Sequence, residues 1–80
     1  MISREYVLDA VKDVICEVLY MHEEDVTEDL HREILCDDLD YVMVLMELEK
    51  KLDVAVDDDA ANKVNTVGEL VDLFYSVLNA

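Results

Sequence analysis

Three aspartates lie close together near the centre of the chain, at Asp37, Asp38 and Asp40. Neighbouring carboxylates can exchange protons in general acid–base catalysis, but only where burial, a nearby charge or a metal ion tunes their pKa values. The surrounding sequence suggests no pocket, no base and no metal that would tune them. We therefore expect no catalytic residue here and a protein that is not an enzyme.

Metal binding finds equally little support in the residue spacing. The second acidic run, Asp57-Asp58-Asp59, lacks the alternating ligands, the central glycine and the closing glutamate of an EF-hand loop. Cys16 and Cys36 do not have metal-ligand spacing, and two cysteines cannot close a zinc site unaided. We expect no metal site, a buried Cys16, and a Cys36 in a loop where it is open to an intermolecular disulfide. His22 and His31 are expected at the surface.

The elements that position these residues are predicted to be helices. The chain has no proline and one glycine, and its apolar residues recur at intervals of three and four. A first helix should follow Ser3 as its N-cap and end near residues 20–22. The segment 23–36 is predicted to be a long loop, pinned to the core by Val26, Leu30 and Ile34. The four tyrosines and Phe74 are spaced as helix-packing residues.

Three further helices complete the predicted fold. The second should begin at Asp37, whose carboxylate can accept from free amides of the first turn, and run to about residue 51. A short third helix is predicted over 57–63. The last begins with a capping box in which Thr66 is the N-cap and Glu69 the third residue. The fold class is therefore all-α, a small four-helix bundle that forms a single domain over residues 1–80.

The second predicted helix has two apolar faces. At about 100° per residue, Tyr41, Val44, Leu45, Leu48 and Leu52 cluster on one side. The opposite side carries Leu39, Val42, Met43 and Met46. A domain of 80 residues has little mass with which to cover both sides of one helix. We interpret the second face as a binding surface, although a core face covered by the long loop is the simpler alternative.

The composition excludes several classes of partner. Six Lys and Arg against 21 Asp and Glu give a net charge of −15. Such a charge repels nucleic acid and anionic membranes and attracts basic protein surfaces. An apolar fraction of 54% indicates a folded chain rather than an acidic tail. No apolar run is long enough for a signal segment or a membrane span, so we expect a cytoplasmic protein and a monomer.

Taken in order, these segments resemble the acyl carrier protein family over nearly the whole chain. The matching segments are Val11 to Leu19, Glu23 to Thr27, Asp37-Asp38-Leu39-Asp40 where the family has Asp-Ser-Leu-Asp, Leu48-Glu49, and Lys63 to Val67 at the entry to the last helix. The resemblance implies a carrier of fatty acid or polyketide-type biosynthesis. In that family a serine at the start of the second helix bears a 4′-phosphopantetheine arm, and synthase or acyl-transfer enzymes dock on that helix through basic patches.

Carried over to this chain, the resemblance implies a set of docking positions on the second helix. They are Asp37, Leu39, Asp40, Val42, Met43, Met46, Glu47 and Glu49. The family's enzymes include the phosphopantetheinyl transferase that attaches the arm. Leu35 stands where the family has a glycine, and Met43, Lys50 and Lys51 stand where it tends to have acidic or polar residues. The predicted docking surface is therefore less acidic and more apolar than is usual in the family.

The most important departure is Asp38, which stands where the family has its serine. A serine hydroxyl forms a stable phosphodiester with the arm, whereas a carboxylate would form a labile acyl phosphate. We therefore expect no phosphopantetheine on the chain as written. Three interpretations of Asp38 remain open: an ordinary helix-start residue favoured by the helix dipole, an engineered block of the site, or a natural homologue that has lost its arm. The corresponding functions are an acyl-carrier-like protein that docks on enzymes, or a regulatory interaction module that kept only the fold.

Overall fold

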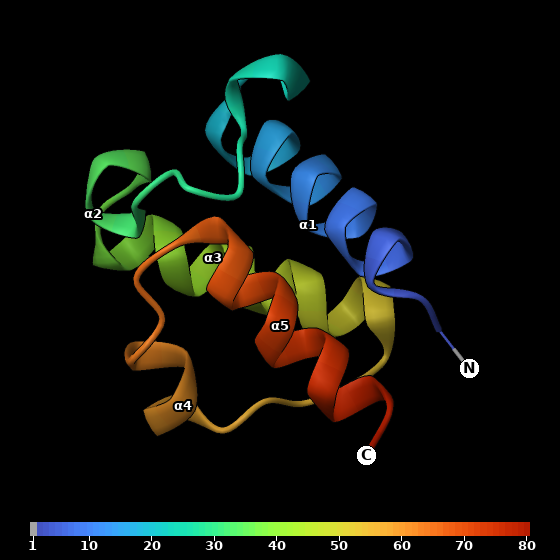
Figure 1. The fold of residues 1–80 in the computed structure, drawn as a ribbon. Helices are drawn as coiled ribbons and strands as arrows, with labels where there is room; N and C mark the ends of the chain where they lie inside the picture. Colours follow the sequence, from blue (N-terminus) through green and yellow to red (C-terminus); the bar gives the residue numbers. More distant parts are fainter. Residues whose placement is uncertain (1) are drawn as a thin grey trace.

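The computed structural model describes residues 2–80, and Figure 1 shows the long helices packed together with the shorter ones at the side. The elements are α1 (Arg4–Leu19), the 3₁₀ turn η1 (Glu23–Asp25), α2 (Arg32–Leu35), α3 (Asp38–Leu52), α4 (Asp58–Asn62) and α5 (Val67–Leu78). Residues 2–80 hold no β-strand, only one isolated bridge between His31 and Thr66. The all-α prediction is confirmed.

The predicted starts of the helices are confirmed by their caps. The Ser3 side chain accepts a hydrogen bond from the first turn of α1, and Asp57 does the same for α4. Asp37 caps α3 in the same way. Thr66 and Glu69 form the capping box of α5, in which each side chain bonds the other residue's backbone amide. Each cap satisfies amides that would otherwise lack a partner, so short polar side chains set where these helices begin.

The core lies between α1, α3 and α5. α1 packs against both α3 and α5, while α4 packs against α5. The buried side chains are Val7, Ala10, Val11, Val14, Ile15, Val26, Tyr41, Val44, Leu48, Leu52, Ala61, Val64, Val67, Leu70, Val71 and Phe74. The α3 contribution comes from one face only, which leaves its other face outside the core. No helix within residues 2–80 has the length and apolar character needed to cross a bilayer.

The connection between α1 and α3 is more structured than predicted. It contains η1 and the single turn α2, where the sequence indicated only a loop. Val26 and Leu30 pack on the core as predicted, but Ile34 is 79% exposed, so its predicted anchoring role is wrong. The α2 turn directs the next residue, Leu35, toward the core instead.

The prediction that all aromatic side chains pack between helices is also only partly right. Phe74 and Tyr41 are buried and Tyr75 packs at the edge of the core. Tyr6 is 57% exposed and Tyr20 is 92% exposed. Tyr20 lies just beyond the last turn of α1, where a left-handed backbone conformation with φ of 56° ends the helix and turns the side chain outward.

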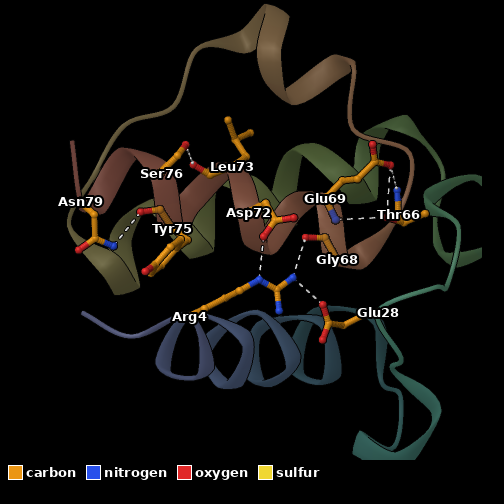
Figure 2. Close-up of polar contacts among 10 residues, drawn as sticks. All are labelled: Arg4, Glu28, Thr66, Gly68, Glu69, Asp72, Leu73, Tyr75, Ser76 and Asn79. Atoms are coloured by element: carbon orange, nitrogen blue, oxygen red, sulfur yellow. Dashed lines mark hydrogen bonds and ion pairs between the residues drawn. The ribbon is translucent and has the colours of Figure 1, made fainter. Parts of the chain in front are cut away.

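Arg4 ties the start of α1 to the connecting loop and to α5 (Figure 2). Its Nε donates to Asp72 Oδ1 at 2.7 Å, and its Nη2 donates to Glu28 and to the Gly68 carbonyl. Gly68 N in turn donates to the Glu28 carbonyl at 2.8 Å. A Cβ on Gly68 would lie 3.1 Å from that carbonyl oxygen, so the close approach of loop and helix favours glycine here. Hydrogen bonding from Arg4 lowers the pKa of the Glu28 carboxyl.

This lowered pKa predicts a pH-dependent contribution to stability. A group whose pKa is depressed by folding stabilises the folded state above its unfolded pKa, about 4.3 for Glu, and loses that contribution as the pH falls through the folded value. We expect Glu28→Gln to have a lower free energy of unfolding than Glu24→Gln at pH 7. This gap should close as the pH falls below about 4, as measured by urea unfolding across a pH series.

Glu24→Gln is the matched control because it removes the same charge at an exposed position with no hydrogen bond or ion pair among residues 2–80. A gap between the two variants that stayed constant with pH would contradict the role given to the Arg4–Glu28 pair.

Candidate functional site

The three central aspartates lie at the start of α3, where each has a different role. Asp37 Oδ1 accepts from Asp40 N at 2.9 Å and so caps the helix. Asp38 is exposed, and its carboxylate has no hydrogen bond or ion pair within the described residues 2–80. The positive end of the helix dipole favours a negative charge at this position. This accounts for an aspartate here but gives its carboxylate no structural partner.

An exposed apolar stripe follows along α3. We call it the α3 stripe, and its members are Leu39, Val42, Met43 and Met46. Leu39 is 78% exposed and the other three are 51–54% exposed. The opposite face of α3 is buried through Tyr41, Val44, Leu48 and Leu52. The two apolar faces predicted from the sequence are therefore present, and the long loop does not cover the outer one.

The predicted acidic docking residues differ in how free they are. Asp37 is committed to its cap, as described above. Glu47 pairs with Lys50 at 3.4 Å on the exposed surface, a contact of small energetic weight. Glu49 is half-buried, and its Oε2 accepts from Val56 N at 3.0 Å, which fastens the segment after α3 back onto the helix. Asp40 is half-exposed beside the cap.

A groove between α3 and α4 was not predicted from the sequence. It has a volume of about 490 Å³, within the usual range of ligand pockets, roughly 300–1,000 Å³. It is lined by Asp38, Tyr41, Val42, Leu45, Met46, Glu49, Asp58 and Asn62. The helical spacing of the six α3 residues could have identified one wall. The sequence predicts the short helix α4 itself, but not how this helix packs against α3 to form the second wall.

Tyr41 holds this wall in place from the inside. Its hydroxyl donates to the Ala61 carbonyl of α4 at 2.6 Å, and the Arg32 guanidinium lies 4.5 Å from its ring centroid. Arg32 also donates to the Ala61 and Asn62 carbonyls at 3.4 and 3.5 Å. Burial raises the pKa of the Tyr41 hydroxyl, against the opposing effect of Arg32. α2, α3 and α4 are thus joined by one polar cluster.

The interior behind Tyr41 is nearly full. A cavity of about 10 Å³ remains between Arg32, Tyr41, Val44, Val64 and the start of α5, the size of a single water molecule at most. Cys36 also lines it and is half-buried rather than exposed in a loop. Burial and the nearby carboxylates, Asp40 first among them, raise the pKa of the Cys36 thiol. The reactive thiolate is therefore disfavoured, and Cys36 is a poor nucleophile.

Neither α2 nor α3 contains a serine or a threonine. The serines and threonines of the chain are Ser3, Thr27, Thr66 and Ser76. Ser3 and Thr66 cap helices, Thr27 donates to Asp29 at 2.6 Å, and Ser76 donates to a carbonyl of its own helix at 2.9 Å. All four hydroxyls have local structural roles, and none belongs to α2 or α3.

Comparison with known proteins identifies the class to which this fold belongs. A family model described as "Phosphopantetheine attachment site" matches residues 9–74. An acyl carrier protein of Thermotoga maritima is 40% identical over 73 residues, which cover 89% of this chain and 90% of that protein. Acyl carrier proteins of a Sulfurovum species and of Wolinella succinogenes are 35% and 34% identical, covering 86% and 81% of this chain and 95% and 88% of those proteins.

This chain therefore belongs to the acyl carrier protein family. The family model is named for a phosphopantetheine site, yet the residues at the start of α3 do not fit covalent attachment of that group. Attachment as a stable phosphodiester needs a hydroxyl, and the first turn of α3 offers carboxylates instead.

The cluster around Tyr41 can be tested by removing one hydrogen bond. We expect Tyr41→Phe to lower the free energy of unfolding by about 1 kcal/mol, the usual net value of a buried hydrogen bond, while the fold is retained. Urea unfolding followed by circular dichroism measures the change. Tyr20→Phe is the matched control, because that side chain is 92% exposed and should change stability little. Equal stabilities of the two variants would show that the Tyr41 hydroxyl does not brace α4.

Proposed function

We propose that this protein works by docking: it is a monomeric, cytoplasmic, single acyl-carrier-like domain over residues 1–80, and it presents α3 to the synthase or acyl-transfer enzymes of a fatty acid or polyketide-type pathway. It performs no catalysis itself. The observation that carries the proposal is the exposed α3 stripe. It lies on α3, the helix that corresponds to the docking helix in the family resemblance.

The α3 stripe supports this proposal on energetic grounds. Fully burying one exposed side chain of this kind contributes about 1.5–3 kcal/mol. Leu39 is 78% exposed, while Val42, Met43 and Met46 are 51–54% exposed and would contribute about half of that each on being covered. Two of them, Met43 and Met46, are flexible side chains that adapt to different partner surfaces. An apolar centre with a charged border is also the usual arrangement of a protein interface.

The charge of the chain indicates what the partner surface looks like. A net charge of −15 favours encounter with a basic surface and disfavours encounter with nucleic acid. Asp37, Asp40 and Glu47 border the α3 stripe in sequence and supply negative charge close to it. We therefore propose partners with basic residues around an apolar depression.

Asp38 distinguishes this chain from a working carrier. We propose that it occupies the position of the family's serine, so the chain as written takes up no 4′-phosphopantetheine. Two observations support this proposal: the Asp38 carboxylate is exposed with no partner among residues 2–80, and neither α2 nor α3 contains a serine or a threonine. The docking surface and the attachment chemistry are then separate properties, of which only the first is retained.

The alternative is an interaction or regulatory module that kept the fold and no longer meets the biosynthetic enzymes. The departures of the α3 surface from the family pattern, Met43 and Lys50 among them, favour this alternative. Affinity capture by the native protein discriminates between the two: synthase and acyl-transfer enzymes support the first, and a set of partners without them supports the second.

One prediction of the proposed function concerns attachment of phosphopantetheine. We expect Asp38→Ser, incubated with coenzyme A and a broad-specificity phosphopantetheinyl transferase, to gain one phosphopantetheine by intact-mass spectrometry, because the substitution supplies the missing hydroxyl. The unmodified wild-type protein and Asp38→Asn, which removes the charge without adding a hydroxyl, are the controls. A folded Asp38→Ser variant that gains no mass would contradict the assignment of this position and favour the regulatory alternative.

Another prediction of the proposed function concerns docking. We expect Met43→Ser to reduce capture of synthase or acyl-transfer enzymes by roughly tenfold or more, since a side chain central to an interface contributes about 1–2 kcal/mol or more. Stability should hardly change, because the side chain is 53% exposed.

Tyr6→Ser is the matched control: it also removes a large side chain that is 57% exposed, but from α1 rather than from α3. If both variants lost partners equally, or neither did, the α3 stripe would not be the docking surface.

A further inference from the structure

Two short helices beside the start of α3, α2 and α4, bury little surface of their own (Figure 1). α2 has four residues, none of which is buried, and α4 has five residues and buries only Ala61. Helices this short do not hold together in water alone, because the first hydrogen-bonded turn costs more conformational entropy than it returns. Both helices therefore depend on the contacts that attach them to the rest of the chain.

The side-chain contacts that join these two helices meet at one carbonyl group. The Tyr41 hydroxyl and Arg32 Nη1 both donate to the Ala61 carbonyl, at 2.6 and 3.4 Å. Arg32 also donates to the Asn62 carbonyl at 3.5 Å, and its guanidinium lies 4.5 Å from the centroid of the Tyr41 ring. Arg32 is the first residue of α2, whereas Ala61 and Asn62 end α4. The same two side chains thus attach both helices to α3.

The backbone adds a further connection between the two sides. Arg32 N donates at 2.8 Å to the carbonyl of Asn65, in the segment between α4 and α5. Displacement of α2 would therefore break backbone and side-chain bonds to the α4 side at the same time. The long helices begin independently of these bonds, because Asp37 caps α3, and Thr66 and Glu69 form the capping box of α5.

Tyr41 also separates the α3–α4 groove from the interior cavity. Among residues 2–80 it alone lines both spaces, the groove of about 490 Å³ and the cavity of about 10 Å³. Arg32, Leu35 and Cys36 form the α2 side of the cavity. The observed positions of α2 and α4 therefore keep the cavity shut and give the groove its second wall.

We infer that α2 and α4 form one opening unit: the two helices unfold together by breaking the contacts of Arg32 and Tyr41, while α1, α3 and α5 stay packed. Segments with few buried apolar contacts open at a lower free energy than the whole domain, and they do so in cooperative groups. The opening unit is a conformational switch for the candidate site. When it is closed the α3–α4 groove exists, and when it is open the groove loses its α4 wall and the cavity meets solvent.

This switch goes beyond the proposed docking function and does not depend on the identity of any partner. A ligand that binds the closed groove against α4 would also protect α2 from opening, because a ligand shifts an equilibrium toward the state that it binds. The two sides of the start of α3 are thereby coupled through the opening unit.

Native-state hydrogen exchange of the full chain measures opening at single amides. Leu35 N and Cys36 N report on α2, where both donate to carbonyls one turn earlier, and Ala61 N reports on α4, where it donates to Asp57. We expect these three amides to share one opening free energy with little dependence on urea, because a small unit exposes little surface. Amides in the middle of α1 should exchange more slowly and with a steep dependence on urea.

A substitution confined to α4 tests whether the two helices open together. Asp57→Ala removes the N-cap of α4, a carboxylate that accepts from Ala60 N at 3.2 Å. We expect exchange at Ala61 to rise roughly fivefold, the usual effect of losing such a cap. Exchange at Leu35 and Cys36 should rise by the same factor, although Asp57 has no hydrogen bond or ion pair to α2 among residues 2–80.

Asp59→Ala is the matched control for this variant. It removes a neighbouring exposed carboxylate of α4 that has no hydrogen bond or ion pair in the described part of the chain. The loss of its dipole interaction is offset by the higher helix propensity of alanine, so exchange at the α2 and α4 amides should change by less than about twofold.

The reciprocal substitution is confined to α2. Ile34 is 79% exposed, so its side chain can be removed without opening the core. We expect Ile34→Gly to exchange roughly fivefold faster than Ile34→Ala at Cys36 and equally so at Ala61, because glycine costs a helix about that factor relative to alanine. Comparison of these two variants keeps the missing side chain the same and changes only the helix propensity.

Three results would overturn the opening unit. They are different opening free energies at the α2 and α4 amides of the wild type, a rise in exchange confined to the helix that carries the substitution, and a urea dependence at these amides as steep as in α1. Failure of the proposed docking function would appear instead in the capture experiment with Met43→Ser, which does not involve hydrogen exchange.

Discussion

The structure is governed by a shortage of positive charge. Six basic side chains serve a chain with 21 carboxylates, so most acidic groups cannot be paired. The two arginines are placed where one side chain can join several segments. Arg4 joins α1, the long connection and α5, while Arg32 joins α2 to α4 across the ring of Tyr41. Arg4 thus ties the irregular connection to two long helices, and Arg32 ties together two helices of four and five residues.

The same shortage shapes the functional surface. Carboxylates that no internal cation reaches are satisfied by backbone amides, as Asp37 and Glu49 are, or are left facing solvent, as Asp38 and Asp58 are. Asp38 lies on α3 together with the α3 stripe, and Asp58 lies on the neighbouring helix α4. The surface thus offers apolar contact and negative charge side by side, and both come from side chains that lie outside the core.

Much of this could be predicted from the sequence, because it depends on local chemistry. Helix starts follow from one short polar side chain and its own first turn, and Asp37 and Thr66 were both identified in this way. The two faces of α3 follow from helical periodicity. What failed depends on tertiary packing: Ile34 and Leu35 are adjacent and equally apolar, and only the orientation of the α2 turn decides which of them reaches the core.

In the candidate site, too, the features that depend on local sequence were predicted and those that depend on tertiary packing were not. The exposed α3 residues were predicted, but the groove was not, because its second wall is a five-residue helix held by the Tyr41–Ala61 hydrogen bond. The acidic start of this short helix is visible in the sequence, but nothing in the sequence indicates the direction from which it packs against α3. The role of Tyr41 was also missed, since the sequence identifies an aromatic residue on a buried face but not the carbonyl to which its hydroxyl donates.

The exposed α3 stripe also bears on how this protein behaves at high concentration. A surface with four neighbouring apolar side chains would ordinarily make copies of a chain adhere to one another. Here the net charge of −15 opposes such association through repulsion between like-charged molecules, so we expect colloidal stability to depend on charge rather than on a polar coat. Protonation of the carboxylates in acid, or screening by concentrated salt, removes that protection and leaves the α3 stripe free to drive self-association.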